Sequence, residues 1–291
     1  MPWIQLTLLI HAGNAETLSQ HLTQQGAVSV TFMGTDQTPD IVEPTPNENP
    51  LWDTLQLTAL FDEHTPNLTS LANTLRLQYP SLTLTPLEDK DWVREWMQYF
   101  HPLQFGHRLW ICPSHATPPD PTAPTLFLDP GLAFGTGTHP TTALCLEWLA
   151  EHCRPTEVVL DYGCGSGILG LAAHKLGARR VVGVDYDPQA IQATRDNARL
   201  NNIHNLETYL PKDCPDFQAT LVIANIISDP LISLAPTLQS HLALGGTLIL
   251  SGLLISQASL VQNAYPTIHF EPPTIQDDWV RLVGRKETPS I

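Results

Sequence analysis

Two carboxylates and the glycines between them are the residues of this chain whose types and spacing are best suited to chemistry. Asp161 ends an apolar, β-branched run, and three glycines then alternate over residues 163–167. Asp185 ends a second apolar run, 22 positions after the first of these glycines. The pattern predicts a strand, a tight glycine turn, a helix and a second strand, which form one βαβ unit of a nucleotide-cofactor site.

Two cofactor classes are compatible with the glycines alone. Residues 165–170 match the G-x-G-x-x-G pattern of dinucleotide-binding enzymes, and Asp185 lies about where such an enzyme places its ribose-binding acid. Asp161 argues against this class, because a pyrophosphate is bound by amide N–H groups at a helix N-terminus and a carboxylate would repel it. S-adenosylmethionine has no phosphate, and an acid would attract its ammonium and sulfonium groups. The pattern therefore resembles that of class I methyltransferases, with a dinucleotide-dependent oxidoreductase as the alternative.

Length and composition indicate a globular protein with room for two domains. The chain has 291 residues, 42% of them hydrophobic, and no unbroken apolar stretch approaches the roughly 18 residues of a membrane span. The N-terminus lacks the features of a secretory signal, so we expect a cytoplasmic protein. Five cysteines without C-x-x-C spacing indicate reduced thiols, and we expect neither a disulfide framework nor a bound metal.

The charge balance restricts the class of partner. With 14 basic and 29 acidic residues, the formal net charge is −15, which argues against direct binding of nucleic acid. A basic protein would be attracted to such a surface, although acidity of this size can equally serve only solubility.

Residues 1–86 are predicted to form a small α+β domain. Alternating or apolar runs predict strands at 3–10, 28–33, 55–61 and 82–86, and helical spacing predicts helices near 18–27 and 68–77. Residues 34–50 are rich in Pro, Asn, Asp and Thr, which is typical of a loop. The order βαββαβ is that of the ferredoxin-like fold, which by itself fixes no function.

A linker containing a helix is predicted at residues 87–104, and the catalytic domain at 105–291. Within the linker, Trp92, Trp96 and Tyr99 recur at helical spacing, which favours packing against a neighbouring domain. The catalytic domain begins with strands near 109–112 and 126–128 on either side of a Pro-rich turn.

The loop at residues 128–142 is dense in glycine and threonine and leads into a helix. Thr138 is the candidate N-cap, with Pro140 in the first turn. The loop lacks the Gly-Lys-Ser/Thr ending of a P-loop. Its hydroxyls and the helix N-terminus are suited to hold the carboxylate or ribose of a cofactor. His139 alone is poor evidence for a general base.

Asn225 is a polar residue at the end of the apolar strand predicted at 221–224. Ligands of open α/β sheets gather at the carboxyl ends of the strands, so residues 225–230 are the best candidate for the acceptor site. The alternative is that Asn225 caps the helix beginning near Asp229. Further along, Gly245–Gly246 are predicted to open a strand at 247–251, and residues 279–284 a last antiparallel strand.

Several segments together resemble the bacterial PrmA family, whose members methylate the eleventh protein of the large ribosomal subunit. The resemblance rests on residues 128–142, 161–169, 222–231, 245–246, 250–252 and 281–286. It covers essentially all of residues 88–287, whereas the front part matches more by position and size than by motif. Departures from the family pattern are the polar insertion around residues 36–49 and Ile227–Ser228.

The resemblance implies a fold, a cofactor and a substrate. The fold is a class I methyltransferase domain with a seven-stranded mixed sheet, preceded by the ferredoxin-like domain, which recognises the ribosomal protein. The cofactor is S-adenosylmethionine, with Thr142, Gly163, Asp185 and Asn225 at the family's cofactor-contacting positions. From the residues themselves we add Asp161, Gly165 and Thr138 to this set. The family methylates the α-amino group and lysine side chains of its substrate, free or on the ribosome, and we expect a monomer.

The predicted chemistry centres on Asn225 and Ile226. Methyl transfer to an amine requires mainly that a neutral amine be positioned in line. We expect the Asn225 side chain and the Ile226 carbonyl to orient the amine lone pair, while water removes the proton. Another protein, a small-molecule amine or a non-catalytic binding role are the alternatives that this pattern leaves open.

Overall fold

The structure is a computed structural model that describes residues 3–34, 53–87, 101–129 and 137–287. The chain divides into two compact units, Met1–Asp91 and Trp92–Ile291, each described by itself below. The expected helix of the linker, with its three aromatic residues, and the polar insertion at 36–49 lie outside the described residues. The end of the range predicted as linker forms a strand, β5 (Leu103–Phe105).

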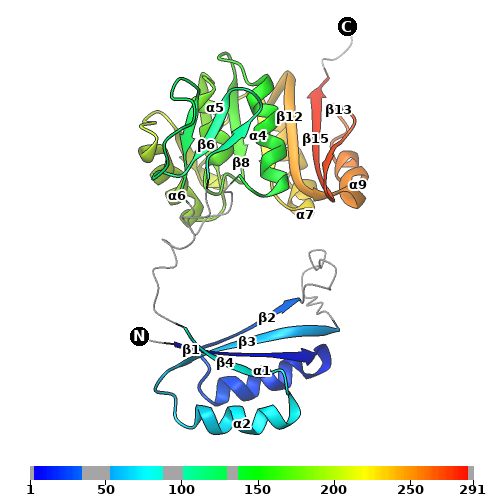
Figure 1. The fold of residues 1–291 in the computed structure, drawn as a ribbon. Coiled ribbons are helices and arrows are strands. Elements are labelled where there is room, and N and C mark those ends of the chain that lie inside the picture. Colours follow the sequence, from blue (N-terminus) through cyan, green and yellow to red (C-terminus); the bar gives the residue numbers. More distant parts are fainter. Residues whose placement is uncertain (1–2, 35–52, 88–100, 130–136, 288–291) are drawn as a thin grey trace. The chain divides into compact units, whose positions relative to one another are not determined.

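The first unit is an antiparallel sheet with two helices on one face (Figure 1). In chain order its elements are β1 (Trp3–His11), η1 (Ala12–Asn14), α1 (Ala15–Gln24), β2 (Ser29–Gly34), β3 (Thr54–Asp62), α2 (Leu68–Gln78) and β4 (Thr83–Leu87). The strand order is β2-β3-β1-β4, with antiparallel pairing throughout. This arrangement confirms the predicted ferredoxin-like fold.

Strict alternation in the strands builds the core of the first unit. In β3, every second residue from Leu55 to Phe61 is fully buried, because successive side chains of a strand point to opposite faces. These side chains pack against apolar residues of the two helices, including Leu22 and Ala72.

The second unit is built on a mixed sheet. Its strands are β8 (Val158–Tyr162), β9 (Arg180–Val184), β10 (Glu207–Tyr209), β11 (Ala219–Asn225), β12 (Leu242–Leu254), β13 (Ile268–Phe270), β14 (Thr274–Gln276) and β15 (Trp279–Lys286). Seven of them run in the order β10-β9-β8-β11-β12-β15-β13, and β14 pairs with β15. Pairing is parallel from β10 to β12 and antiparallel at β15. The predicted seven-stranded mixed sheet is confirmed, and β14 adds an eighth strand.

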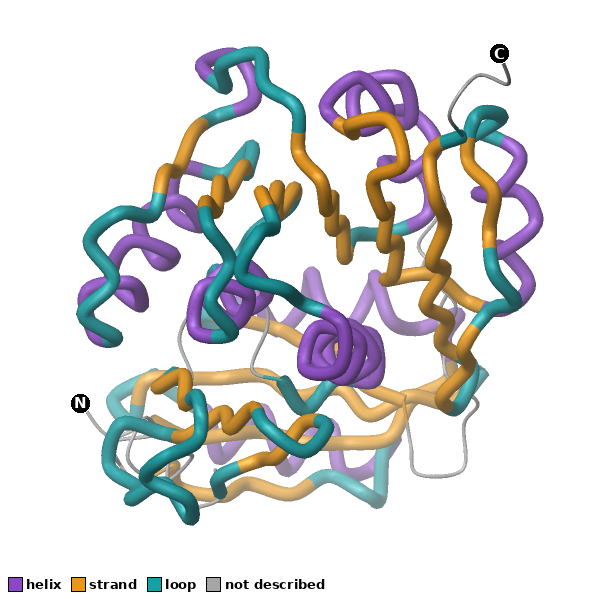
Figure 2. The backbone as a smooth tube through the Cα atoms, turned by 90° about the horizontal axis from the view of Figure 1, so that it is seen from above, coloured by secondary structure: helices purple, strands orange, loops and turns teal. Residues whose placement is uncertain are grey.

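Helices cover both faces of this sheet (Figures 1 and 2). They are α4 (Pro140–His152), α5 (Ile168–Lys175), α6 (Pro188–Leu200), α7 (Ser228–Ser233), α8 (Ala235–His241) and α9 (Ala258–Asn263), with the short 3-10 helices η2 (Pro211–Asp213) and η3 (Ile255–Gln257). A separate small sheet, in the order β5-β6-β7, contains β6 (Leu109–Cys112) and β7 (Thr125–Phe127).

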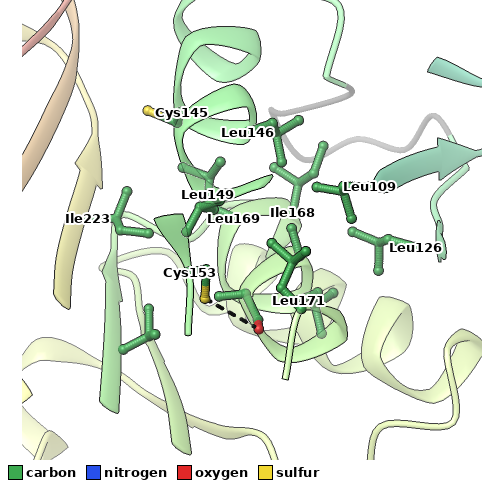
Figure 3. Packing of buried hydrophobic residues seen from close by; sticks show 14 of the residues in the cluster. Leu109, Leu126, Cys145, Leu146, Leu149, Cys153, Ile168, Leu169, Leu171 and Ile223 are labelled. Carbon is green, nitrogen blue, oxygen red and sulfur yellow. Dashed lines mark hydrogen bonds between the residues drawn. The ribbon is translucent and has the colours of Figure 1, made fainter. Parts of the chain in front are cut away.

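Two apolar cores lie on opposite faces of the mixed sheet. Helices α4 and α5 and the small sheet pack on one face, where the core includes Leu146, Leu149, Ile168, Leu171, Leu109 and Leu126 (Figure 3). Residues of α7, α8 and α9 pack on the other face. Burial on both faces explains why the central strands are continuous apolar runs rather than alternating ones.

Strand β12 begins earlier than its sequence predicts. The glycine pair was expected to open it, but Leu242 already pairs with Ala219 of β11, and pairing resumes between Thr247 and Leu221. Gly245, with φ +71°, lies in the irregular stretch between these pairs. The glycines therefore permit a break in the register rather than a strand end.

Three further features bear on function. No described helix is long and apolar enough to cross a membrane. Within the same residues, no cluster of His, Cys, Asp and Glu side chains could hold a metal ion. All five cysteines are free thiols.

Candidate active site

The glycine turn between β8 and α5 is left-handed at all three of its alternating glycines. The φ angles of Gly163, Gly165 and Gly167 are +80°, +55° and +81°. Residues with a Cβ rarely adopt such angles. A Cβ at Gly167 would also lie 2.8 Å from Cγ2 of the buried Thr194, so both conformation and space require glycine there.

The amides of this turn already donate hydrogen bonds within the protein. Gly163 N and Cys164 N donate to the carbonyl of Val184 at 2.7 and 3.1 Å, and Gly167 N donates to that of Cys164 at 2.7 Å. The acceptors of two further amides are carboxylates: Gly165 N donates to Asp185 and Gly170 N donates to Asp161. A pyrophosphate would need such amides to be available. Their engagement therefore argues against the dinucleotide alternative.

Helix α6 holds the carbonyls of the same turn. Thr194 Oγ1 donates to the carbonyl of Gly165 at 2.9 Å, and Asn197 Nδ2 donates to that of Ser166 at 2.8 Å. Sequence reasoning missed both residues. Their spacing, three apart on the helix, was the available signal, since it places both side chains on one face.

A pair of alanine substitutions separates the two reasons for glycine in this turn. Gly177 lies outside the turn, directly after the C-cap of α5. It also has a positive φ, +98°, but the nearest atom to its Cβ would lie at 3.7 Å. We expect Gly177→Ala to lower the free energy of unfolding by about 1 kcal/mol through conformational strain alone. Gly167→Ala adds a clash in a packed region and should cost about 2–4 kcal/mol. Denaturant unfolding of both variants tests this; equal losses would contradict the steric part of the argument.

Asp161 lies in the interior of the second unit, with only 1% of its surface exposed. Its Oδ2 accepts a hydrogen bond of 2.8 Å from Gly170 N in the first turn of α5. The N-cap of α5 is Gly167, which has no side chain, so Asp161 supplies the cap from the preceding strand. Burial, and to a smaller extent Asp185, raise the pKa of Asp161 to about 7, despite the opposing hydrogen bond from Gly170.

Asp185 follows directly after β9 and joins that strand to the glycine turn. Its Oδ2 accepts from Gly165 N at 2.9 Å, and its Oδ1 accepts from Asp187 N at 3.0 Å. Each carboxylate oxygen has a second acceptor position. The side chain is thus fixed in orientation while it keeps capacity for hydroxyl donors.

The start of α4 differs from the prediction at one residue. The N-cap is His139 rather than Thr138: the His139 Nδ1 accepts from Thr141 N at 3.3 Å, and Pro140 takes the first helical position. Thr138 lies outside the helix and is exposed. The imidazole of His139 thus caps the helix amides in place of the Thr138 hydroxyl. The N-cap preferences of the amino acids favour Thr over His and therefore did not indicate this. Burial lowers the pKa of His139, which favours the neutral ring. Residues 130–136 of the preceding loop lie outside the described residues.

Thr142 and Asn225, 83 positions apart, meet at the carboxyl edge of the sheet. Asn225 is the last residue of β11, and its Nδ2 donates to Thr142 Oγ1 at 3.1 Å. Thr142 is fully buried in the first turn of α4. The N-cap of α7 is Ile227, without a side-chain cap, so the alternative that Asn225 caps this helix is wrong. The amide of Asn225 is oriented by Thr142 instead.

Ile226 links the end of β11 to both neighbouring elements. Its N donates to the carbonyl of Ser251 in β12 at 3.1 Å. Its side chain lies against Gly163, where a Cβ would be 2.3 Å from Ile226 Cγ2. The structure thus brings Asp161, Gly163, Gly165, Asp185, Thr142, Asn225 and Ile226 together at the carboxyl ends of neighbouring strands β8, β9 and β11, the usual ligand edge of an open α/β sheet.

The chain is similar to proteins of one family along nearly its whole length. A family model described as ribosomal protein L11 methyltransferase (PrmA) matches residues 2–287. The chain is 49% identical to the ribosomal protein L11 methyltransferase of Aeromonas hydrophila, over 98% of this chain and 99% of that protein. It is 50% identical to that of Salmonella arizonae, over 99% and 100%. A solved structure of ribosomal protein L11 methylase from Lactobacillus delbrueckii subsp. bulgaricus is 32% identical with a TM-score of 0.60, covering 65% of this chain and 100% of that chain.

The mixed sheet, the glycine turn and the acid after β9 define a class I methyltransferase domain, here preceded by a ferredoxin-like unit. The family model matches residues 2–287, and this match identifies the family within the class. The chain belongs to the ribosomal protein L11 methyltransferase (PrmA) family.

Proposed function

We propose that this methyltransferase uses S-adenosylmethionine to methylate the α-amino group and lysine side chains of ribosomal protein L11. The relatives at about half identity are named for L11 as substrate and align along the whole chain. The observation that carries the proposal is the Asn225 amide, held by Thr142 beside the glycine turn. An oriented amide at this place is suited to hold an amine acceptor next to a cofactor.

The chemistry of the turn fits S-adenosylmethionine. Its engaged amides leave little for a phosphate, whereas Asp185 keeps acceptor positions for ribose hydroxyls. When bound, S-adenosylmethionine supplies a methyl group already activated by its sulfonium. We assign the cofactor to Gly163, Gly165, Asp185, Asn225 and the start of α4 with Thr138 and Thr142. Asp161 then supports the turn indirectly, because its Oδ2 is engaged by Gly170 N at the start of α5.

The acceptor must be neutral when it reacts. An α-amino group with a pKa near 8 is about one-tenth neutral at pH 7, whereas deprotonating a lysine of pKa 10.4 costs about 4.6 kcal/mol. An acid held against the amine would raise its pKa further. Neutral partners such as the Asn225 Oδ1 and the Ile226 carbonyl orient the amine without this penalty. The proton leaves to water.

The ferredoxin-like unit is assigned to substrate recognition. Its sequence, residues 1–91, holds 11 acidic and two basic residues, so a basic protein is attracted to it rather than a nucleic acid. We expect a monomeric enzyme that works in the cytoplasm, where ribosomal protein is available free or on the ribosome.

Mass spectrometry of L11 after incubation with enzyme and S-adenosylmethionine tests the function. We expect mass increases in steps of one methyl group on the N-terminal residue and on lysines. Titration with labelled S-adenosylmethionine and, separately, NAD should show binding of the first only. Binding of NAD without methyl transfer would contradict the proposed cofactor.

Deleting residues 1–86 tests the assignment of the front unit. The catalytic domain has its own two cores, so we expect the truncated protein to keep its affinity for S-adenosylmethionine and to lose methylation of L11. The full-length protein is the control for both measurements. Full methylation by the truncated enzyme would place substrate recognition elsewhere.

A further inference from the structure

Ile226 is enclosed between two glycines from different elements. Gly163 of the glycine turn has φ +80°, and a Cβ there would be 2.3 Å from Ile226 Cγ2. Gly252 of β12 has φ +88°, and a Cβ there would be 2.4 Å from the Ile226 carbonyl oxygen and 2.7 Å from its carbon. Real Cβ atoms essentially never come within 3.0 Å of such atoms, so neither position has room for a Cβ.

The two contacts differ in kind. Gly163 meets the end of a side chain, which a smaller residue at 226 would remove. Gly252 meets backbone atoms, which every residue at 226 possesses. Gly163 therefore sets the position of the Ile226 side chain, and Gly252 sets the position of the Ile226 peptide group.

A bulge in β12 brings Gly252 into this position. Leu250 pairs with Leu282 of β15 and Leu253 pairs with Val280, so two residues, 251 and 252, stand opposite one. The hydroxyl of Ser251, which is fully buried, lies in donor geometry to the carbonyls of Val280 at 3.0 Å and of Thr141 at 3.2 Å. The bulge is thereby tied to β15 and to the first turn of α4.

The same bulge fixes the residues that face the acceptor. Asn225 pairs with Ser251 across the strands, and Ile226 N donates to the Ser251 carbonyl. Bulges near active sites commonly redirect the residues beside them. A displacement of about 1 Å in a reacting geometry can cost about 100-fold in rate.

We propose that Gly252 is a positioning residue for methyl transfer, which together with Gly163 clamps Ile226 and sets the acceptor segment against the cofactor turn. The proposal rests on the function proposed above, because it takes residues 225 and 226 as the acceptor side. Gly252 itself contacts no reacting atom and acts through Ile226.

The main experiment compares Gly252→Ala with Gly245→Ala. Gly245 lies in the same strand with φ +71°, and nothing lies within 4 Å of its Cβ position, so its variant carries only the conformational strain. We expect Gly252→Ala to lower kcat on L11 roughly 10- to 100-fold, with the Kd for S-adenosylmethionine changed less than about 3-fold. Gly245→Ala should keep both constants. Equal kcat values for the two variants would overturn the proposal.

Second substitutions at Ile226 separate the two sides of the clamp. Gly163→Ala should weaken cofactor binding, and Ile226→Ala should restore part of it by removing Cγ2. Ile226→Val keeps Cγ2 and should restore nothing. Neither should restore kcat in Gly252→Ala, because that contact is with the backbone. Recovery of Gly252→Ala by Ile226→Ala would show that no backbone clamp exists.

Two further arms keep the test decisive. If Gly252→Ala does not fold, Ser251→Ala loosens the bulge without adding atoms and should lower kcat about 3- to 10-fold at unchanged cofactor Kd; an unchanged kcat would contradict the proposal.

Failure of the proposed function would appear in the wild-type protein as absent methyl transfer. The contact of Gly252 with Ile226 would then be judged by melting temperature, which Gly252→Ala should lower more than Gly245→Ala does; equal melting temperatures would contradict it.

Discussion

Replacing Asn225 with alanine is expected to lower kcat for methyl transfer to L11 about 100-fold, the loss typical of a reacting group that is no longer held in position. In the structure, Thr142 holds the Asn225 Nδ2, which leaves the Oδ1 as the group that can accept from an amine. Alanine removes this acceptor while it leaves the backbone of β11 in place. The Kd for S-adenosylmethionine, measured by calorimetry, should rise much less than kcat falls.

Substitutions of Thr142 provide the matched controls for this result. Thr142→Val keeps the shape but removes the hydroxyl, so the Asn225 amide loses its fixed orientation, and we expect a smaller fall in kcat of about 10-fold. Thr142→Ser keeps the hydroxyl and should stay close to wild type. A wild-type kcat in Asn225→Ala would exclude the orienting role. A rise in Kd alone would restrict Asn225 to cofactor binding.

Replacing Asp161 with asparagine is expected to remove a large pH dependence of stability. The pKa of Asp161 is about 7 in the folded protein, against an ordinary value of 3.8, because burial disfavours its charge. The folded state therefore holds this proton more tightly than the unfolded chain does. The resulting stabilisation is complete below pH 4 and is lost as the pH rises from about 4 through about 7. The difference corresponds to about 4 kcal/mol.

The measurement is denaturant unfolding of wild type and Asp161→Asn from pH 4 to pH 8, followed by tryptophan fluorescence. The free energy of unfolding of wild type should fall, relative to the variant, by about 4 kcal/mol over this range. Asparagine keeps an oxygen that can accept from Gly170 N, so the cap of α5 is preserved. Asp161→Ala lacks it and should be less stable than Asp161→Asn at every pH. Parallel pH profiles for wild type and Asp161→Asn would contradict the raised pKa.

The order of the elements could be predicted because each strand and helix carries its own local pattern. Apolar runs ending in Asp161 and Asp185 predicted β8 and β9, and alternation in residues 55–61 predicted β3. Asn225 was identified because a polar residue at the end of a buried strand is unusual. The short strands β13 and β14 have no comparable pattern over three residues, and they form only because β15 lies beside them.

Other features depend on contacts between distant residues and were therefore beyond sequence patterns. Thr194 and Asn197 hold the glycine turn only after α6 packs beside it. The bulge at Ser251 and Gly252 exists because β12 must pair with both β11 and β15. Asp161 was correctly placed beside the turn, but its burial and its capping of α5 could not be seen from its spacing.

The self-contained hydrogen bonding of the glycine turn has a consequence for ligand affinity. Amides bound by Val184, Cys164, Asp161 and Asp185, and carbonyls bound by α6, give the turn its final shape as soon as the domain folds. The entropic cost of ordering this segment is met during folding rather than on association. A ligand that docks there meets a rigid, preorganised surface, and affinity depends on how well its shape matches that surface.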